Sequence, residues 1–362
     1  MRIINIVGAR PNFMKIAPLM AEMRRFRDIE PLLIHTGQHY DSNMSGRFFE
    51  ELAIPTPDYN LEVGSGSHTW QTAQVMLALE PLLDKVRPDM IVVVGDVNST
   101  MAAALVAAKL RIPLAHVEAG LRSFDRTMPE EINRMVTDSL ADFLFTTERS
   151  GNENLKREGV PENKIHFVGN VMIDTLLRCR QRIDAQIITN RFGVAPRNYA
   201  LLTLHRPSNV DVTETLSGIL DALVDIQNKL PILFPLHPRT RRRIAEAGLF
   251  ERARGLANLK LLEPLGYMEF LGLMAQAKLV MTDSGGIQEE TTILGIPCLT
   301  LRENTERPVT IAEGTNELVG TQAERIIAGV HRILNRKTGN SQHPELWDGH
   351  AAERIVNVLR GH

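Results

Sequence analysis

Cysteine is scarce in this sequence. Only Cys179 and Cys298 occur among 362 residues, far apart and without a C-x-x-C pair or a nearby histidine cluster. Two such isolated residues exclude a disulfide framework and speak against a structural zinc site, so we expect a reducing compartment.

Long hydrophobic runs and an excess of charge of one sign are also missing. No stretch approaches the roughly 18 apolar residues of a membrane span, and the first apolar run stops at Gly8-Ala9-Arg10-Pro11, too early for a secretory signal. We therefore expect a cytoplasmic protein without membrane contact. Its 41 basic and 43 acidic residues leave a net charge of −2, which gives no field that would attract nucleic acid.

What the sequence does contain is a regular alternation of short apolar runs and longer amphipathic segments. Continuous apolar strands between helices are typical of a parallel sheet covered on both faces. The predicted strands are Ile3–Val7, Pro31–His35, Met90–Val94, Leu114–Val117, Phe143–Thr146 and Ile165–Val168, then Tyr199–Leu204, Pro231–Pro235, Leu259–Leu262, Leu279–Met281 and Pro297–Leu301. The predicted helices include 15–26, 69–86, 99–110, 131–140, 174–191 and 349–360. The pattern restarts near 169–175, so two doubly wound α/β units are expected.

Ligands of such sheets bind beyond the carboxyl ends of the strands, and the first predicted strand ends in a glycine turn. Gly8 to Asn12 lead into a helix that carries Lys15. A helix N-terminus flanked by cations suits an anion, although an ordinary turn with exposed basic residues explains it equally well. After the second strand, His35 and His39 lack the spacing of a metal site.

Three carboxylates follow the next strands of the first half. Asp96 ends one strand, Glu118 ends the next, and Glu130 opens a helix after Pro129. Each has a structural explanation: a helix cap for Asp96, a pair with Arg122 for Glu118, and a dipole complement for Glu130. Because all three would share one sheet edge, we expect them to raise each other's pKa and to act in proton transfer.

The second half places cations and glycines at its strand ends. His205 is the first polar group after one strand, and the arginine run 239–243 is predicted to be a solvated helix face. Thr282 to Glu290 form a Ser-Gly-Gly turn before a helix, which suits a diphosphate, with Glu290 placed to accept hydrogen bonds from ribose hydroxyls. Arg302, Glu306 and Arg307 follow the next strand and are expected close to the phosphates.

The order of these motifs resembles a known family. The succession GARPNFMK, GDVNST, HVEAGLRS, PEEINR, LHRP, TDSGGIQEE and TERP is similar, over nearly the whole chain, to the non-hydrolysing UDP-N-acetylglucosamine 2-epimerases. The TDSGG-x-x-E motif alone implies only a nucleotide-sugar fold of the glycosyltransferase-B type, and HVEAGLRS with PEEINR narrows it to the epimerases.

This resemblance implies two Rossmann-like domains whose parallel sheets face a central cleft. The expected domains are 1–169 and 170–348, with a C-terminal helix in 349–362 that packs back on the first and a UDP site mainly on the second. A homodimer that needs no metal and no cofactor is implied as well. The implied activity interconverts UDP-N-acetylglucosamine and UDP-N-acetylmannosamine by eliminating UDP to 2-acetamidoglucal and adding it back.

The family's functional residues carry over by motif. The resemblance implies catalytic roles for Asp96, Glu118, Glu130 and His205, with the carboxylates handling protons and His205 stabilising the leaving group. It implies substrate binding by Arg10, Lys15, Arg134, Ser284, Gly285, Gly286, Glu290 and Arg307.

Two segments depart from the family pattern. Tyr40 follows Gln38-His39 where many bacterial members have Arg, and Pro207-Ser208 follow His205-Arg206 where they have Arg-Glu. Both segments border the family's activating UDP-sugar site, for which Gln38, His39, Arg206 and His237 are the candidates. The departures leave open a modified substrate such as UDP-2,3-diacetamido-2,3-dideoxy-glucuronate. A hydrolysing epimerase, a glycosyltransferase and a non-catalytic nucleotide-sugar sensor are the competing hypotheses.

Overall fold

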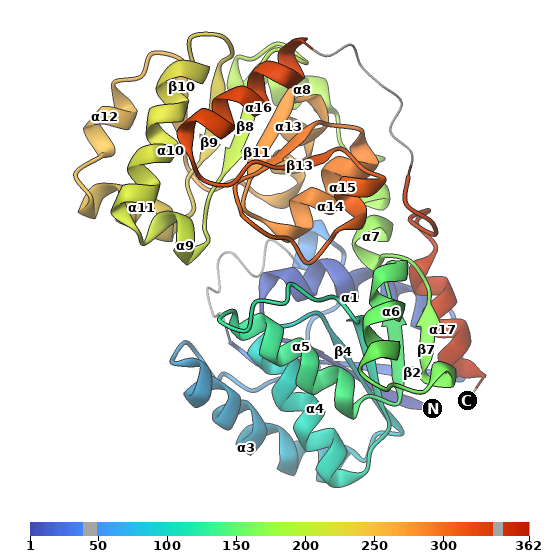
Figure 1. The fold of residues 1–362 in the computed structure, drawn as a ribbon. Coiled ribbons are helices and arrows are strands. Elements are labelled where there is room, and N and C mark those ends of the chain that lie inside the picture. Colours follow the sequence, from blue (N-terminus) through green and yellow to red (C-terminus); the bar gives the residue numbers. More distant parts are fainter. Residues whose placement is uncertain (39–48, 336–342, 362) are drawn as a thin grey trace. The chain divides into compact units, whose positions relative to one another are not determined.

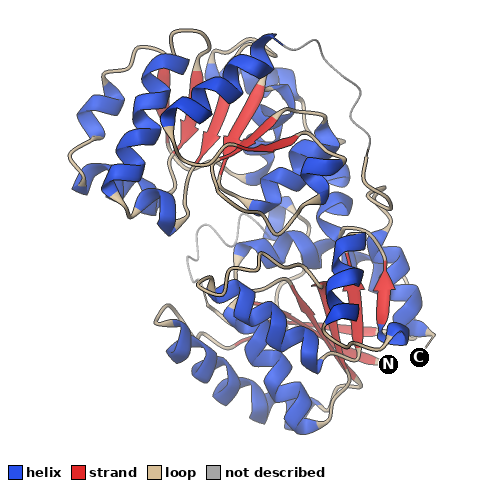
Figure 2. Cartoon of the chain, in the orientation of Figure 1, coloured by secondary structure: helices blue, strands red, loops and turns tan. Residues whose placement is uncertain are grey.

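Two parallel β-sheets organise the chain, each in its own unit (Figure 1). The computed structural model describes residues 1–38, 49–335 and 343–361. Contacts divide the chain into a first unit, Met1–Arg178 with Glu345–His362, and a second unit, Cys179–Pro344. In both units the strands are flanked by helices on either side (Figure 2), which agrees with the predicted α/β class.

The first unit contains a seven-stranded sheet of order β3-β2-β1-β4-β5-β6-β7, with every pair parallel. Its strands are β1 (Arg2–Val7), β2 (Glu30–His35), β3 (Tyr59–Asn60), β4 (Met90–Val94), β5 (Leu114–Ala119), β6 (Phe143–Thr146) and β7 (Ile165–Phe167). Its helices are α1 (Arg10–Met23), α3 (His68–Val86), α4 (Asn98–Leu110), α5 (Pro129–Leu140), α6 (Arg149–Arg157), the 3₁₀ turn η1 (Glu162–Lys164), α7 (Val171–Arg180) and α17 (Ala351–Arg360).

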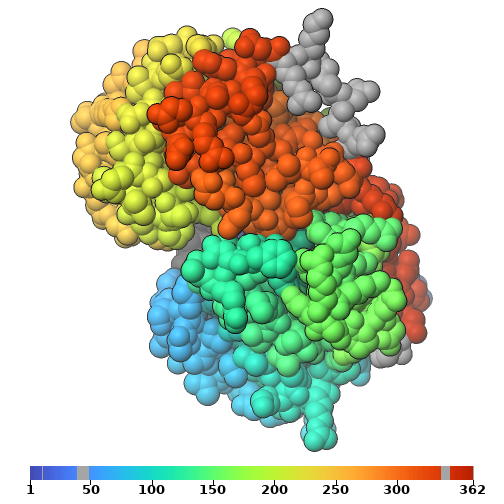
Figure 3. Space-filling view, viewed as in Figure 1, coloured from blue at the N-terminus to red at the C-terminus, as the bar shows by residue number. Residues whose placement is uncertain are grey.

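Helices cover both faces of this sheet. Helices α3, α4 and α5 pack in series on one face, and α1 packs against α17 on the other. Figure 3 shows the residues of α4, α5 and α6, coloured teal to green, at the surface of this unit. Strand β4 (MIVVV) is buried at all five positions, as expected for a β-branched strand in the middle of a covered sheet.

The second unit contains a six-stranded parallel sheet of order β10-β9-β8-β11-β12-β13. Its strands are β8 (Ala200–Thr203), β9 (Ile232–Pro235), β10 (Leu259–Leu262), β11 (Leu279–Thr282), β12 (Cys298–Thr300) and β13 (Asn316–Leu318). Its helices are α8 (Ala185–Phe192), α9 (Pro207–Val210), α10 (Thr213–Ile226), α11 (Pro238–Glu246), α12 (Phe250–Arg254), α13 (Tyr267–Gln276), α14 (Gly285–Leu294), α15 (Val309–Ala312) and α16 (Ala323–Asn335).

The division between the units falls at Arg178/Cys179, within α7, rather than at the expected 169/170. Helix α7 stays with the first unit because Thr175 donates a hydrogen bond to the Met14 carbonyl (2.6 Å). Asp174 also accepts bonds from the N–H groups of Ala351 and Ala352 (3.2 and 2.8 Å), which begin α17. The predicted helix 174–191 is therefore two helices, α7 and α8.

In both sheets the strand order reverses once, between β1 and β4 and between β8 and β11. Such a switch point leaves a crevice beyond the strand ends, where doubly wound proteins bind ligands. Among the described residues, no helix is long and apolar enough to cross a membrane.

Candidate functional site

The first switch point is held together by Asn12. Its side-chain oxygen accepts hydrogen bonds from the N–H groups of Gly8 and Ala9 (3.0 and 3.2 Å), and its Nδ2 donates to the Val94 carbonyl (2.8 Å). The turn after β1 is thus bound to the end of β4. Arg10 begins α1, but its side chain lies outside the described part of the structure.

A buried ion pair lies beside this turn. Lys15 of α1 pairs with the Glu118 carboxylate at the end of β5, and both side chains are about 95% buried. Gly95 approaches the pair closely, since a Cβ at this position would lie 2.6 Å from the Lys15 Nζ. Arg122, the structural partner suggested by sequence, instead bonds Asp138.

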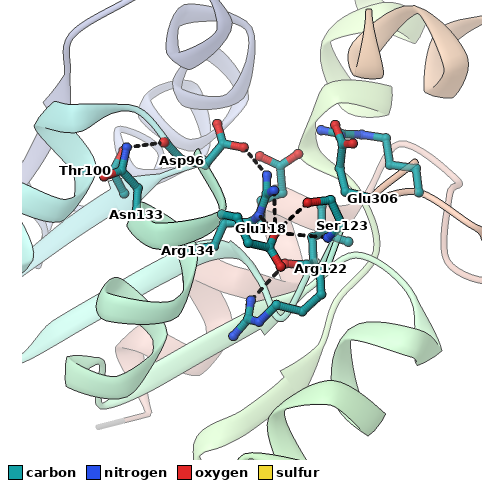
Figure 4. A network of polar contacts seen from close by, with 12 residues as sticks. Asp96, Thr100, Glu118, Arg122, Ser123, Asn133, Arg134 and Glu306 are labelled. Carbon is teal, nitrogen blue, oxygen red and sulfur yellow. Dashed lines mark hydrogen bonds and ion pairs between the residues drawn. The ribbon is translucent and has the colours of Figure 1, made fainter. Parts of the chain in front are cut away.

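Asp96 belongs to a second ion pair, drawn in Figure 4. The Asp96 Oδ2 lies 2.5 Å from Nη1 of Arg134, whose Nη2 lies 2.7 Å from the Glu131 carboxylate. Asn133 donates to the Asp96 carbonyl (2.8 Å). Burial opposes ionisation of Glu131, but bonds from Ser123 and Arg134 outweigh it and hold the pKa of Glu131 below its usual range.

Two of the three carboxylates predicted from sequence pair with cations. Glu118 pairs with Lys15 and Asp96 with Arg134, so each carboxylate has an opposite charge beside it. Glu130, in the first turn of α5, is half-buried and makes no hydrogen bond or ion pair within the described ranges. Asp96 keeps 23% of its side chain exposed, so Asp96 and Glu130 reach the surface while Glu118 does not.

In the second unit a buried aspartate orients the residues after β8. Asp283 accepts hydrogen bonds from the N–H groups of His205 and Arg206 (3.0 and 2.9 Å), and its Oδ1 lies 2.8 Å from the His205 Nδ1. Burial alone would raise the pKa of Asp283, but His205 and these backbone donors hold it below its ordinary value. The carboxylate therefore keeps a proton on Nδ1 and leaves Nε2 of the half-exposed ring for other partners.

The Ser-Gly-Gly turn follows β11 at the same switch point. Ser284 precedes the first residue of α14 and makes no side-chain cap, so the first N–H groups of the helix are not satisfied by that side chain. A Cβ on Gly285 would lie 2.6 Å from Nη1 of Arg307 and 2.7 Å from the Glu306 carboxylate. Glycine is needed here for close approach.

Arginines gather beside this turn. Glu306 lies 2.8 Å from Arg302, 2.5 Å from Arg307 and 3.5 Å from Arg206, and Arg307 also bonds Glu289 at 2.7 Å. Burial opposes ionisation of Glu306, but the arginines outweigh it and hold the pKa of Glu306 far below its usual range.

Three arginines gather around two carboxylates in this cluster, with Arg206, Arg302 and Arg307 next to Glu306 and Arg307 also next to Glu289. The Arg302 Nη1 is buried and has no hydrogen-bond partner in the described residues. Burial and its arginine neighbours lower the pKa of Arg302. Several arginines beside a helix N-terminus suit an anion with several oxygens.

Glu290 lies one turn further along α14 and is buried. The Tyr267 hydroxyl donates to its Oε1 (2.7 Å). Burial raises the pKa of Glu290 to about 7, although the Tyr267 bond acts in the opposite direction. Sequence reasoning missed Tyr267, which begins α13 and meets Glu290 only in the folded unit.

The four candidates for an activating site are distributed over both units. Gln38 is buried, and its side-chain oxygen accepts from the Ser99 N–H and hydroxyl (3.1 and 2.7 Å). His39 lies outside the described residues. His237 is exposed and caps α11, whereas Arg206 donates to the Asp283 carbonyl (3.0 Å).

No group of three or more potential metal ligands occurs within residues 1–38, 49–335 and 343–361. The arginine run behaves as a largely exposed face, where Arg239 and Arg243 pair with Asp211.

Known proteins match this chain over nearly its whole length. The family model for UDP-N-acetylglucosamine 2-epimerase matches residues 21–360. A UDP-N-acetylglucosamine 2-epimerase of Methanocaldococcus jannaschii is 45% identical over 99% of both chains. A UDP-2,3-diacetamido-2,3-dideoxy-D-glucuronate 2-epimerase of Pseudomonas aeruginosa is 40% identical, again over 99% of both.

A solved structure matches equally well. The crystal structure of the Methanocaldococcus jannaschii UDP-GlcNAc 2-epimerase, in complex with UDP-GlcNAc and UDP, superposes with a TM-score of 0.93 at 45% identity over 100% of both chains. Such a match in sequence and fold confirms the resemblance carried by the motifs. The chain belongs to the UDP-N-acetylglucosamine 2-epimerase family.

Proposed function

We propose that this protein is a non-hydrolysing epimerase that interconverts UDP-N-acetylglucosamine and UDP-N-acetylmannosamine. The observation that carries the proposal is the pair of sites at the two switch points. One holds carboxylates against Lys15 and Arg134, and the other holds several arginines at a glycine turn. The first suits proton transfer and the second suits a diphosphate.

The C2 proton of an N-acetylhexosamine is not adjacent to a carbonyl, so its direct removal is very unfavourable. Elimination avoids that barrier. A carboxylate takes the C2 proton, the C–H electron pair forms the C1=C2 bond, and UDP leaves with the electrons of the C1–O bond. UDP then adds back to C1 while C2 receives a proton on the opposite face. We assign the proton transfers to Asp96, Glu118 and Glu130.

The departing diphosphate needs stabilisation of its negative charge. We assign this to Arg10, Arg307 and the N–H groups of 284–286, with His205 oriented by Asp283. Lys15 and Arg134 would hold the carboxylates as well as contact substrate. Glu290 would accept hydrogen bonds from the ribose hydroxyls in place of the Tyr267 hydroxyl.

A modified sugar is the second candidate substrate. The relative from Pseudomonas aeruginosa named for a diacetamido glucuronate is nearly as similar as the one named for UDP-N-acetylglucosamine. Elimination at C2 would be the same for both sugars, since it does not involve the substituents at C3 and C6. A hydrolysing epimerase would use the same first half-reaction but release UDP and free sugar.

We also propose a homodimer in the cytoplasm, with a second UDP-sugar site that includes Arg206 and His237. Helix α3 supports a dimer because it exposes Trp70 (44%) and Leu77 (66%), two turns apart on one face. Sedimentation of the protein and of Leu77→Asp tests it, with a monomeric variant expected.

One experiment separates these activities. The protein is incubated in D₂O with UDP-N-acetylglucosamine, and in parallel with the diacetamido glucuronate nucleotide, and followed by proton NMR. We expect UDP-N-acetylmannosamine carrying deuterium at C2, without net release of UDP. Accumulation of UDP with free sugar would favour the hydrolase, and exchange only in the second sample would favour the modified substrate.

A further inference from the structure

The end of β5, which carries Glu118, has an unusual backbone. The register with β6 shifts between Val117 and Ala119, so Glu118 is the extra residue of a β-bulge. Its φ is +76°, and Gly120 follows at +79°. A left-handed conformation is rare for glutamate and persists only where surrounding contacts hold it. A bulge at a strand end re-aims its side chain, here toward Lys15.

His116, two residues before Glu118, is fully buried, and both of its ring nitrogens face acceptors. Nδ1 lies 2.6 Å from the Asp138 Oδ1, and Nε2 lies 2.8 Å from the Gly95 carbonyl oxygen. A carbonyl can only accept, so Nε2 must carry a proton. The short contact with the carboxylate likewise needs a proton between Nδ1 and Oδ1. The ring therefore bridges Gly95 and Asp138.

Asp138 provides the other end of the bridge. Its Oδ2 accepts from the Gly120 N–H (3.1 Å) and lies 2.7 Å from Nη2 of Arg122. Burial by itself would raise the pKa of Asp138, but His116 and Arg122 hold it below its usual value. Asp138 is therefore ionised and bound to both sides of the bulge, to His116 before Glu118 and to Gly120 after it.

The bridge joins the two strand ends that carry functional carboxylates. Gly95 precedes Asp96 at the end of β4, and its backbone also lies against the Lys15–Glu118 pair. Helix α5 supplies the supports as one stripe. Three residues at helical spacing on α5 each hold one part of the site. Glu131 accepts from the Ser123 N–H, Arg134 pairs with Asp96, and Asp138 accepts from Gly120 in the bulge.

We propose that His116 is a positioning residue for the epimerisation, which ties Gly95 to Asp138 and so holds Asp96 and Glu118 in their working geometry. The inference rests on the proposed function, because it assigns the proton transfers to these two carboxylates. A displacement of about 1 Å at a reacting group can cost roughly 10²-fold in rate. Loss of the bridge should therefore lower kcat while leaving the nucleotide site of the second unit intact.

The main test compares two histidine variants. In His116→Asn the short amide cannot reach both Gly95 and Asp138, so we expect kcat to fall about 30- to 100-fold with KM changed less than about threefold. His166→Asn is the matched control, because His166 lies on the edge strand β7 of the same sheet, is partly buried, and has no partner for Nε2 in the described residues. Its kcat should stay within about threefold of the parent.

Two variants of Asp138 test whether its hydrogen bonds to His116 and Gly120 matter, or only the volume of its side chain. In Asp138→Asn these hydrogen bonds can persist, because the amide nitrogen can donate to Nδ1 of a neutral imidazole and the amide oxygen can still accept from Gly120. We expect nearly unchanged kcat for this variant and a loss like that of His116→Asn for Asp138→Ala. The combination of His116→Asn with Asp138→Ala should be no worse than the worse single variant, because both break one bridge. Equal activity of Asp138→Asn and Asp138→Ala would overturn the proposal.

A direct observation does not depend on the stability of any variant. In the ¹⁵N-labelled parent protein, the ring N–H of the buried His116 that donates to the Gly95 carbonyl should be protected from hydrogen exchange. This protection should persist in Asp138→Asn and be lost in Asp138→Ala. A parent spectrum in which no histidine ring N–H is protected contradicts the proposal, as does a folded His116→Asn with parent kcat. An inactive parent protein would instead contradict the proposed function.

Discussion

The two switch points differ in how they handle charge. In the first unit, Glu118 pairs with Lys15, and Arg134 is shared by Asp96 and Glu131. In the second unit, three arginines surround Glu306, and one of them, Arg307, also pairs with Glu289. Both sites are mostly buried, so the difference lies in composition and geometry rather than in exposure to water.

The two arrangements suit different tasks. A carboxylate that exchanges protons must return to its starting state in each turnover, and a neighbouring cation favours its ionised form. Several arginines at a glycine turn suit a diphosphate. Changes in the first unit should therefore lower mainly kcat, whereas changes in the second should weaken nucleotide binding as well as slow the departure of UDP.

The largest effect is expected for Glu118→Gln, which removes the buried carboxylate of the first unit. Loss of a general base lowers rates by roughly 10²- to 10⁴-fold, so deuterium exchange at C2 should fall by that amount. Calorimetric titration with UDP should give a Kd within about threefold of the parent. Because Lys15 loses its partner, the melting temperature should fall as well.

The exposed Glu153→Gln is the control for this change, since Glu153 pairs with Arg157 across about a turn of α6 at the surface. It should change neither exchange nor melting temperature. A Glu118→Gln variant that retains exchange, or that loses UDP affinity in proportion, would remove the proposed division between the units.

A smaller effect, mainly on affinity, is expected for Gly285→Ala. The added Cβ would meet Nη1 of Arg307 at 2.6 Å and the Glu306 carboxylate at 2.7 Å, so the arginine must move out of its place. We expect the Kd for UDP to rise about 10- to 100-fold, or roughly 1.4 kcal/mol for each factor of ten. Exchange at saturating substrate should fall much less.

Gly218→Ala is the matched control, because a Cβ there meets nothing within 4 Å and α10 tolerates alanine. A Gly285→Ala variant that binds UDP as tightly as the parent would remove this turn from the proposed nucleotide site.

The nucleotide site should also depend on pH. The pKa of Glu290 is raised to about 7 by burial, so the carboxylate is largely protonated at pH 6 and largely ionised at pH 8. Only the ionised form can accept bonds from both ribose hydroxyls, so UDP affinity should rise by about three- to tenfold over this range. Glu290→Gln should bind UDP more weakly and show only the titration of UDP itself.

The raised pKa of Glu290 also makes the stability of the fold depend on pH. Stability should fall as the pH rises, whereas UDP affinity should increase. Because the pKa of Glu290 is higher in the folded protein than its ordinary value of 4.5, the folded state binds this proton more tightly. The contribution to stability is complete below about pH 4.5 and is lost as the pH rises through about 7. Thermal melts of Glu290→Gln should lack this part of the pH dependence.

The strand ends and their glycine turns were predictable because they are local patterns. The run 90–94 is apolar at each position and is strand β4, and Ser284–Gly286 open a helix as expected. The helix predicted over 174–191 was wrong because Asp184 caps a new helix by accepting from the Gln186 N–H (3.0 Å). The short edge strands β3 and β13 were too brief for periodicity to reveal.

The supports of the site could not be predicted because they depend on tertiary contacts. Glu118 pairs with Lys15, 103 residues away, rather than with the nearby Arg122. His116 and Asp138 were missed, although two signals pointed to them. A histidine in the middle of an apolar strand needs polar partners, and Glu131, Arg134 and Asp138 form a charged stripe on one helix.

The smallest effect is expected for a change at the C-terminal helix. It tests whether this helix stabilises the first unit, to which its contacts assign it. Asp174 accepts from the first N–H groups of α17, so Asp174→Ala should cost about 1 kcal/mol, as for loss of a helix cap. Hydrogen exchange should speed up in α17 and in the packed face of α1, while UDP affinity stays unchanged. Faster exchange in the second unit instead would show that α17 stabilises the nucleotide-binding unit and not the carboxylate-bearing one.

The stability lost in Asp174→Ala should also depend on pH. Burial raises the pKa of Asp174 to about 6, so ionising its carboxylate destabilises the folded parent protein. The difference in unfolding free energy between parent and variant should therefore shrink from pH 5 to pH 8.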